Sequence, residues 1–243
     1  MKFSIITITY NSERYLEKTL ESVQEQSFQD YEHLVWDGGS SDGTIEIVKK
    51  FPKIKIRIGK DKGISDAMNK GAEIAKGEFL LHLHSDDMLH CQDTLHLVNA
   101  FLENRPDLSW IYGQAEVIDS EGNLIRTTKH IPYKRRLLRK YNIITHPSSF
   151  VSRKLFIESG GFRKDLRYCM DYELWLRLSK IASAKAMPFI VSKFREHNHS
   201  LSSRETLKVS DEAYKVRNEY VRNIWERYRS YRTWKRRRKA IKT

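Results

Sequence analysis

Two adjacent carboxylates, Asp86 and Asp87, follow an apolar segment at residues 78–84, Glu-Phe-Leu-Leu-His-Leu-His. That segment is typical of a buried strand, so both acids are expected at its carboxyl end. In open α/β sheets ligands bind at that edge, and paired carboxylate oxygens suit Mg²⁺ or Mn²⁺ carrying a diphosphate. An Asp-Asp pair is also common in turns and at helix N-caps, so its meaning depends on the polar groups around it.

Polar residues also follow two other predicted strands. The first strand ends in Thr9-Tyr10-Asn11, and Asp37-Gly-Gly-Ser-Ser-Asp42-Gly-Thr follows the second. Glycines allow the backbone to approach a ligand closely, and Asp37 can accept hydrogen bonds from a base or a ribose. The alternative is an ordinary glycine-rich turn in which Asp42 caps the next helix.

A further polar segment, Asp-Lys-Gly-Ile-Ser-Asp-Ala-Met-Asn-Lys-Gly at residues 61–71, opens a predicted helix after the third strand. Asp66, Asn69 and Lys70 lie on one side of that helix. An ordinary capped helix would also explain this segment by itself. Because every one of these segments follows a strand, we expect them to gather along one edge of the sheet.

Strands and helices alternate through the first hundred residues. Predicted strands cover 3–9, 31–36, 54–58 and 79–84, and predicted helices cover 12–26, 42–51, 64–75 and 94–104. This alternation predicts an α/β fold with a mainly parallel, doubly wound sheet flanked by helices. The second half is different, with strands expected at 110–117, within 118–128, at 150–152 and at 186–194. Helices are expected there at 132–139, 154–159 and 172–181, followed by one or two long helices from residue 205.

The composition fits one large α/β domain with a helical appendage. Hydrophobic residues make up 40% of the 243 residues, and no apolar run approaches the roughly 18–20 residues of a membrane span. The first ten residues are typical of a strand and not of a signal peptide. Cys91 and Cys169 lack metal-site spacing and do not suggest a disulfide framework. We therefore expect a reduced, cytoplasmic setting.

The C-terminal segment is strongly basic. Residues 222–243 contain ten Lys or Arg against one acid, and so carry +9 of the net charge of +13. Four aromatic residues recur every three positions among these cations: Trp225, Tyr228, Tyr231 and Trp234. On a helix this arrangement suits the headgroup layer of an anionic membrane. The alternatives are that the aromatic rings pack on the domain while the charges are solvated, or that the tail binds nucleic acid.

These motifs together resemble those of glycosyltransferase family 2, whose members have the GT-A, or nucleotide-diphospho-sugar transferase, fold. The matching segments are Thr-Ile-Thr-Tyr-Asn-Ser, Asp-Gly-Gly-Ser-Ser-Asp-Gly-Thr, Asp-Lys-Gly-Ile-Ser-Asp-Ala-Met-Asn-Lys-Gly and Leu-His-Ser-Asp-Asp, in the family's order and spacing. The resemblance implies a GT-A catalytic domain at 1–204, with a nucleotide-binding half at 1–104 and an acceptor-binding half at 105–204. Residues 205–243 would form a basic, aromatic helical tail.

The resemblance also implies roles for residues of the first half. The nucleotide pocket would be lined by Thr9, Tyr10, Asn11, Asp37, Asp66 and Asp86, with Lys70 near the phosphates. Asp86 would contact the ribose or the diphosphate. Asp87, the last acid of an Asp-x-Asp-like motif, would hold the divalent metal, Mn²⁺ or Mg²⁺. Ser65 stands where many relatives carry Tyr, which removes an aromatic ring near the donor.

In the second half the family has an acidic motif, often Glu-Asp, at the start of a helix. Its counterpart is residues 169–173, Cys-Met-Asp-Tyr-Glu, and Asp171 is the expected catalytic base. Since Met170 replaces the usual Glu, Glu173 is an alternative base, and Asp171 would also serve as a helix N-cap. Upstream, Gly160-Gly161-Phe162 is expected to shape the floor of the acceptor site.

Further residues are expected to close over the donor. His146 matches a position near the donor sugar, with a structural role as the alternative. Arg195 or His197 would neutralise the leaving diphosphate, and His199 is a further candidate in the same segment. The alternative for this segment is a surface loop after the last strand.

The function that the resemblance implies is inverting, metal-dependent transfer of a sugar from a nucleoside-diphosphate sugar to a hydroxyl acceptor. The expected acceptor is a saccharide or lipid-linked saccharide in the assembly of bacterial O-antigen, capsule or exopolysaccharide. The protein would then be cytoplasmic or peripheral on the inner face of the membrane, held through residues 222–243, with no nucleic-acid partner.

Three other functions compete with this one. A non-catalytic nucleotide-sugar-binding module of the same fold would not need intact acids at 86, 87 and 171. A nucleic-acid-binding protein would leave the strand-end residues unexplained. A nucleotidyltransferase would need a glycine-rich, cationic loop near the N-terminus, and residues 7–14 lack one.

Overall fold

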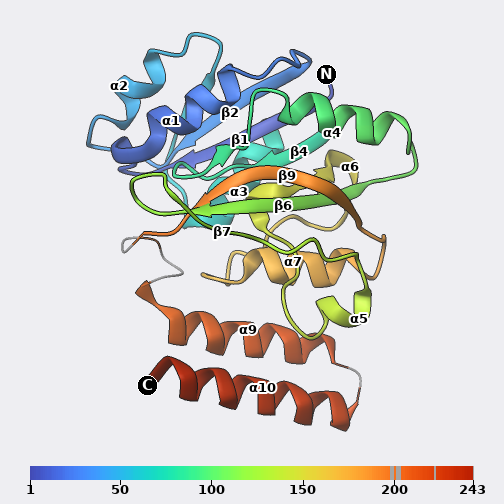
Figure 1. The fold of residues 1–243 in the computed structure, drawn as a ribbon. Coiled ribbons are helices and arrows are strands. Elements are labelled where there is room, and N and C mark those ends of the chain that lie inside the picture. Colours follow the sequence, from blue (N-terminus) through green and yellow to red (C-terminus); the bar gives the residue numbers. More distant parts are fainter. Residues whose placement is uncertain (198–199, 201–203, 222, 243) are drawn as a thin grey trace.

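The computed structural model describes residues 1–197, 200, 204–221 and 223–242 (Figure 1). Its first half confirms the predicted alternation. The parallel strands are β1 (Phe3–Thr9), β2 (Tyr31–Asp37), β3 (Lys55–Ile58) and β4 (Phe79–His82), in the order β3-β2-β1-β4. The intervening helices are α1 (Glu13–Gln24), α2 (Thr44–Lys49) and α3 (Ile64–Ile74), and α4 (Thr94–Glu103) follows. In this register Thr9 lies beside Asp37, so two predicted site residues are neighbours across the strands.

The sheet becomes mixed beyond β4, which the expectation of a mainly parallel sheet did not include. It continues through β8 (Ser149–Ser152), β6 (Trp110–Ile118) and β9 (Lys185–Arg195), with β7 (Leu124–Thr127) paired to β6. β8 is antiparallel to both β4 and β6, whereas β9 is parallel to β6. A strand that follows a chain reversal can enter a sheet in either direction, and alternation of residues alone does not fix which.

The expectation that the fourth strand runs to His84 is wrong, because β4 ends at His82. The chain then turns through Ser85-Asp86-Asp87 and enters a two-residue strand, β5 (Met88–Leu89), which the sequence did not indicate. β5 pairs antiparallel with the end of β9, placing Met88 beside Lys193. The carboxylate pair therefore lies in the turn between β4 and β5, and the pairing of β5 with β9 holds the end of that turn.

Helices cover both faces of the sheet (Figure 1). On one face α1 and α4 pack against β1, with Val23, Leu95 and Val98 in contact with Phe3 and Ile5 in one core cluster. On the other face α3 packs with α7 (Met170–Leu178) in a second cluster. Shorter helical segments complete the second half: α5 (Arg135–Leu138), η1 (His146–Ser148) and α6 (Arg153–Glu158).

The C-terminal region forms two antiparallel helices, α9 (Thr206–Tyr220) and α10 (Ile224–Lys242), stacked below α7 (Figure 1). Ala213 and Val216 of α9 are buried in the same core cluster as α7. α10 is held on α9 by Trp234, whose ring stacks on Tyr214 at 4.9 Å and whose Nε1 donates to Asp211 Oδ1 at 2.6 Å. Among the described residues, no helix is both long enough and apolar enough to cross a membrane.

Candidate active site

A cavity of about 600 Å³ opens at the carboxyl ends of the parallel strands. It is bounded by the end of β1, the turn after β4, the start of α7 and the segment after β9. Eight of the predicted site residues line it: Thr9, Tyr10, Asp86, Asp87, His146, Asp171, Arg195 and His197. The cavity therefore brings together residues from positions 9 to 197 of the chain, as expected for ligand sites at this edge of an α/β sheet.

Asp37 lies behind the cavity wall and does not line it. Its carboxylate is fully buried and accepts four hydrogen bonds, from Thr9 Oγ1 at 2.8 Å, Ser40 Oγ at 2.6 Å and the backbone N–H groups of Gly39 and Ser40. Asn11, at φ 50°, accepts a hydrogen bond from Ser41 N on the same loop. These two residues fix the glycine-rich loop against the end of β1, next to the cavity.

Asp66 and Lys70 form an ion-pair cluster at the start of α3, outside the cavity lining. Asp66 is buried, and its carboxylate lies 2.6 Å from Lys164 Nζ and 3.3 Å from Lys70 Nζ. The Lys164 hydrogen bond, together with those from Lys62 N and Lys70, lowers the pKa of Asp66 to about 2. Asp66 is consequently ionised at neutral pH and anchors the loop at residues 61–63, of which Asp61 and Gly63 line the cavity.

Arg195 holds the carboxylate turn from behind. Its backbone N–H donates to Asp87 Oδ1 at 3.0 Å, its Nε donates to the Asp86 carbonyl at 3.1 Å, and its Nη1 donates to the carbonyls of Asp119 and Ser120. The side chain is 1% exposed, and its guanidinium also lies 4.6 Å from the Tyr15 ring. The guanidinium is therefore engaged by backbone carbonyls, and the structure gives it a supporting position.

His197 lies on the open side of the same turn. Its Nε2 is 3.0 Å from Asp86 Oδ2. Although burial raises the pKa of Asp86, the hydrogen bond with His197 and the positive field of His84 lower it overall. Asp86 is thus held as a carboxylate at the cavity wall. His199 lies outside the described residues.

Asp87 is suited to hold a divalent cation. Its side chain is 1% exposed, and Oδ2 is a buried oxygen with no hydrogen-bond partner. Burial and the charge of Asp86 raise the pKa of Asp87 well above its usual value. No group of three or more His, Cys, Asp or Glu in the described part of the chain is placed to hold a metal. The two aspartates therefore fit a cation whose other ligands are diphosphate oxygens or water, which is how Mg²⁺ is commonly bound.

Asp171 lies across the cavity, in the first turn of α7. Oδ1 accepts a hydrogen bond from Tyr172 N at 2.6 Å, and Oδ2 accepts one from Asn142 Nδ2 at 3.2 Å. Burial raises its pKa to about 6. The helix begins at Met170 with Cys169 as N-cap, so Asp171 is not the capping residue. A carboxyl group with this pKa is ionised at neutral pH and can accept a proton.

Glu173, the alternative base, faces away from the cavity. It is 1% exposed and forms a bidentate ion pair with Arg177, and it also accepts a hydrogen bond from Tyr220. Arg177 continues to the carbonyls of Ser159 and Gly161. Glu173 therefore joins α7 to α9 and to the glycine turn, and its position does not allow a role as base in the cavity.

The glycine turn itself is clamped by α3 and does not line the cavity. Asn69 accepts a hydrogen bond from Phe162 N and donates one to Phe162 O, both at 2.8 Å. Gly161 has φ +67°, and a Cβ there would lie 2.5 Å from Asn69 Oδ1. Only glycine fits this position, which explains the motif structurally.

His146 lines the cavity among aromatic neighbours. Its ring lies 5.2 Å from His84, 5.6 Å from Phe162 and 6.0 Å from Trp175. Burial and the neighbouring His84 and His82 lower its pKa well below the usual value, so the ring is neutral. Its Nε2 is buried without a hydrogen-bond partner, which leaves a polar atom available for a ligand.

Comparison with known proteins identifies the family. The sequence model of glycosyl transferase family 2 matches residues 4–159, which include both the carboxylate turn and the glycine-rich loop. The chain belongs to glycosyl transferase family 2. It is 31% identical over 216 residues to a PGL/p-HBAD biosynthesis glycosyltransferase of Mycobacterium tuberculosis, covering 85% of this chain and 82% of that protein.

Longer family 2 relatives contain the chain as a part. It is 28% identical over 226 residues to a chondroitin synthase of Escherichia coli, covering 91% of this chain but 33% of that protein. The chain thus spans about a third of that relative's length. The crystal structure of S. aureus TarS residues 1–349 in complex with UDP-GlcNAc superposes with a TM-score of 0.73 at 20% identity, covering 89% of this chain and 66% of that one. The GT-A fold is therefore confirmed.

Sequence reasoning missed two residues that position this family 2 site. Lys164 makes the shorter of the two ion pairs to Asp66, and Asn142 donates to Asp171. Both come from the second half of the chain, in segments without a recognisable motif. Lys164 follows the Gly-Gly-Phe turn by two residues, and that turn was the only signal that pointed to its neighbourhood.

Proposed function

We propose that the protein is an inverting, metal-dependent glycosyltransferase that moves a sugar from a nucleoside-diphosphate sugar to a hydroxyl acceptor. One cavity contains both groups that this reaction needs, a carboxylate pair suited to a metal diphosphate and a separate carboxyl group with a pKa of about 6. Family membership and the similarity to a UDP-GlcNAc complex support a nucleotide-sugar donor.

The nucleotide would lie along the ends of β1 and β2. Tyr10 is exposed beside the cavity, Thr9 is fixed by Asp37, and Asp61 lines the same wall. Asp86 and Asp87 would hold Mn²⁺ or Mg²⁺. The cation would supply positive charge against which the leaving diphosphate is stabilised. His197, next to Asp86, would donate a hydrogen bond to a diphosphate oxygen.

Asp171 would act as the general base. Its carboxylate accepts the proton of the acceptor hydroxyl as that oxygen attacks the anomeric carbon, the bond to the diphosphate oxygen breaks, and the configuration inverts. Hydrogen bonds from Tyr172 N and Asn142 Nδ2 hold the Asp171 carboxylate in one orientation, so its free lone pairs would face the acceptor hydroxyl in one fixed direction. No covalent enzyme intermediate is required in a direct displacement.

The acceptor would be a saccharide of a surface polysaccharide, carried on a lipid at the inner face of the cell membrane. α10 supports this location because Ile224, Trp225, Tyr228 and Tyr231 are exposed, with Trp225 71% exposed. Exposed aromatic residues beside Lys and Arg favour the headgroup layer. The names of two relatives, a chondroitin synthase and a PGL/p-HBAD biosynthesis glycosyltransferase, are consistent with a saccharide acceptor.

A non-catalytic nucleotide-sugar-binding module is the second candidate. It would need neither the intact acids at 86 and 87 nor a carboxyl group of raised pKa on the opposite wall, so the position of Asp171 favours the enzyme. In the enzyme, the half at residues 1–104 would bind the donor and the half at residues 105–204 would bind the acceptor.

A thermal-shift titration with UDP, GDP, dTDP and CMP, each with and without Mn²⁺, tests the donor site. We expect one nucleotide to raise the melting temperature only when Mn²⁺ is present, because a ligand stabilises the state that binds it. Slow hydrolysis of the corresponding nucleotide sugar should accompany it. Binding without any turnover of donor would favour the non-catalytic module, and no shift with any nucleotide would contradict the proposal.

A further inference from the structure

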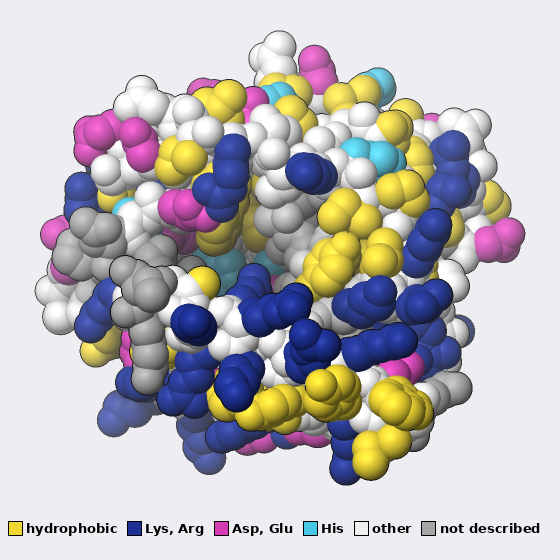
Figure 2. Space-filling model, turned by 60° about the horizontal axis from the view of Figure 1, so that its bottom comes forward, with side chains coloured by type: hydrophobic (Ala, Val, Ile, Leu, Met, Phe, Trp, Pro, Cys, Tyr) yellow, Lys and Arg dark blue, Asp and Glu magenta, His cyan; other side chains and the backbone are white. Residues whose placement is uncertain are grey.

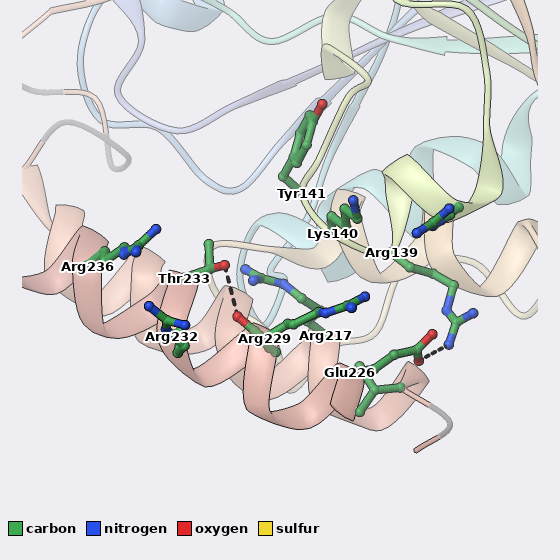
Figure 3. A pocket seen from close by; sticks show the side chains of 12 residues that line it. Arg139, Lys140, Tyr141, Arg217, Glu226, Arg229, Arg232, Thr233 and Arg236 are labelled. Carbon is green, nitrogen blue, oxygen red and sulfur yellow. Dashed lines mark hydrogen bonds and ion pairs between the residues drawn. The ribbon is translucent and has the colours of Figure 1, made fainter. Parts of the chain in front are cut away.

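A second hollow, about 460 Å³ in volume, lies between α10 and the segment at residues 135–141 (Figure 3). We call it the cationic groove. The upper wall contributes Arg136, Arg139 and Lys140, and α9 contributes Arg217. α10 contributes Arg229, Arg232 and Arg236 from below. Seven cationic side chains therefore line the groove with a single acid, Glu226.

The charge of the groove is largely uncompensated. Glu226 pairs with Arg139. The ion pairs of the described residues include no carboxylate partner for Arg136, Lys140, Arg229, Arg232 or Arg236. Figure 2 shows the result as a band of Lys and Arg side chains across this face, with a row of hydrophobic side chains beside it. Like charges brought together in this way destabilise the free protein and attract an anion.

Two buried polar atoms in the groove also lack hydrogen-bond partners. Arg217 is 4% exposed and Ser230 is 5% exposed, yet Arg217 Nε and Ser230 Oγ make no hydrogen bond. Both residues line the groove. Buried polar groups are nearly always paired, so an unpaired N–H and an unpaired hydroxyl in one hollow indicate a ligand with acceptor oxygens.

The groove continues toward the candidate active site. An adjoining hollow of about 440 Å³ shares Arg217, Thr233 and Arg236 with it and extends to Asn142. The side chain of Asn142 donates to Asp171, the candidate base. An extended molecule with an anionic group in the groove can therefore reach the wall on which Asp171 lies.

We infer that the cationic groove binds a phosphate group of the acceptor, a diphosphate or phosphodiester, and so makes the acceptor a phosphate-bearing saccharide. The inference rests on the proposed transferase function. Six of the seven cations are arginines, whose planar guanidinium binds phosphate oxygens in pairs. A phosphate chain offers several oxygens to several guanidinium groups at once, and the volume is that of a small-molecule site.

Calorimetric titration of the full chain with inorganic pyrophosphate, in EDTA to suppress metal-dependent binding at the donor site, tests the groove. Arg232→Gln/Arg236→Gln removes two groove cations, and Arg227→Gln/Lys235→Gln is the matched control. Both variants remove two charges from α10 and one cation–aromatic contact, Arg232 on Tyr228 or Lys235 on Tyr231. We expect the groove variant to bind about tenfold more weakly, equivalent to about 1.4 kcal/mol, and the control to match the wild type. Equal losses in both variants, or no binding by the wild type, would overturn the inference.

Vesicle flotation distinguishes the two sources of phosphate. The groove variant should no longer float with phosphatidylcholine vesicles that carry a polyprenyl diphosphate. With phosphatidylglycerol vesicles, the groove variant and the control should float equally well. If the groove variant, but not the control, no longer floated with phosphatidylglycerol vesicles, the groove would be a site for lipid headgroups. That result would overturn the acceptor assignment. Metal-dependent nucleotide binding, measured on the same variants, should be unchanged. If the wild type showed no metal-dependent nucleotide binding, the transferase function would be contradicted. If nucleotide binding were intact but the groove variant bound pyrophosphate as tightly as the control, only this inference would be contradicted.

Discussion

The backbone N–H of Arg195 donates to Oδ1 of Asp87 at 3.0 Å, while Oδ2 of the same carboxylate remains buried and unpartnered. One oxygen is thus used to fix the turn, and the other is left available for a ligand. The Arg195 side chain strengthens this arrangement by holding the Asp86 carbonyl and the turn at residues 119–120. The metal-binding geometry we propose therefore depends on a residue that need not contact the metal.

Replacement of this arginine should weaken metal binding indirectly. We expect Arg195→Lys to unfold more easily by between about 1.5 and 3 kcal/mol, because a single ammonium cannot reach all three carbonyls. The Mn²⁺ concentration needed for nucleotide binding should rise about tenfold. Arg126→Gln is the control, since Arg126 pairs with Glu196 on the same part of the sheet but is half exposed. Unchanged metal affinity in Arg195→Lys would show that Arg195 does not position the turn.

Neutralising Asp86 and neutralising Asp87 should change the stability of the metal-free protein in opposite directions. Asp87→Asn removes a buried carboxylate of raised pKa and keeps an oxygen for Arg195 N, so the metal-free protein should melt about 2–4 °C higher. Asp86→Asn removes a carboxylate that the structure stabilises through His197, so its melting temperature should fall. Calorimetry in EDTA measures both. Asp87→Asn should also lose the Mn²⁺-dependent part of nucleotide binding, and full retention of that part would exclude Asp87 as a metal ligand.

The pH dependence of transfer should report Asp171. Because burial raises its pKa to about 6, the rate should fall as the pH drops through 6, with the base protonated below that value. Asp171→Asn should lower the turnover number by about 10²–10⁴-fold and leave nucleotide binding intact. Parallel loss of binding and transfer would contradict the assignment.

The same shift predicts a stability difference. A carboxyl group whose pKa is raised in the folded state favours folding below its unfolded pKa of about 4, and that contribution is lost as the pH rises through about 6. Asp171→Asn should therefore gain stability relative to the wild type above pH 6 and lose the advantage below pH 4. Urea unfolding at pH 4 and pH 7.5 measures this, with Asn142→Asp as a variant that should raise the pKa of Asp171 further.

Much of the fold followed from local patterns in the sequence. The buried positions of α1, Leu16, Thr19, Leu20 and Val23, recur at helical spacing. The parallel strands β1, β2 and β4 contain short apolar runs, and β3 alternates between apolar and cationic residues. Strand ends then placed Thr9 and the carboxylate pair at one edge. These features depend on neighbours in sequence, which is why they could be predicted.

The remaining features depend on contacts between distant segments. β5 has two residues and exists because β9 pairs with it, so no periodicity could reveal it. Asp66 and Lys164 are 98 positions apart, and the buried position of Arg195 follows from the return of β9 beside the turn at Asp87. The family resemblance predicted Arg195 or His197 as the cation near the diphosphate, but the hydrogen bonds of Arg195 to backbone carbonyls could be seen only in three dimensions.

The aromatic residues of α10 should differ in their effects on membrane binding. Trp225 and Tyr228 are 71% and 53% exposed, whereas Trp234 is packed on Tyr214 and bonded to Asp211. We expect Trp225→Ala/Tyr228→Ala to reduce flotation with phosphatidylglycerol vesicles about tenfold without changing the melting temperature, because most of both rings is exposed and would be covered by lipid.

Trp234→Ala provides the contrast, since it should destabilise the α9–α10 pair and lower the melting temperature. Ile181→Ala is the matched surface control, because Ile181 is 61% exposed and lies outside α10. Its flotation should equal that of the wild type. If Trp225→Ala/Tyr228→Ala also floats like the wild type, the exposed aromatic residues do not bind the membrane, and attraction of Lys and Arg to anionic lipid would be sufficient.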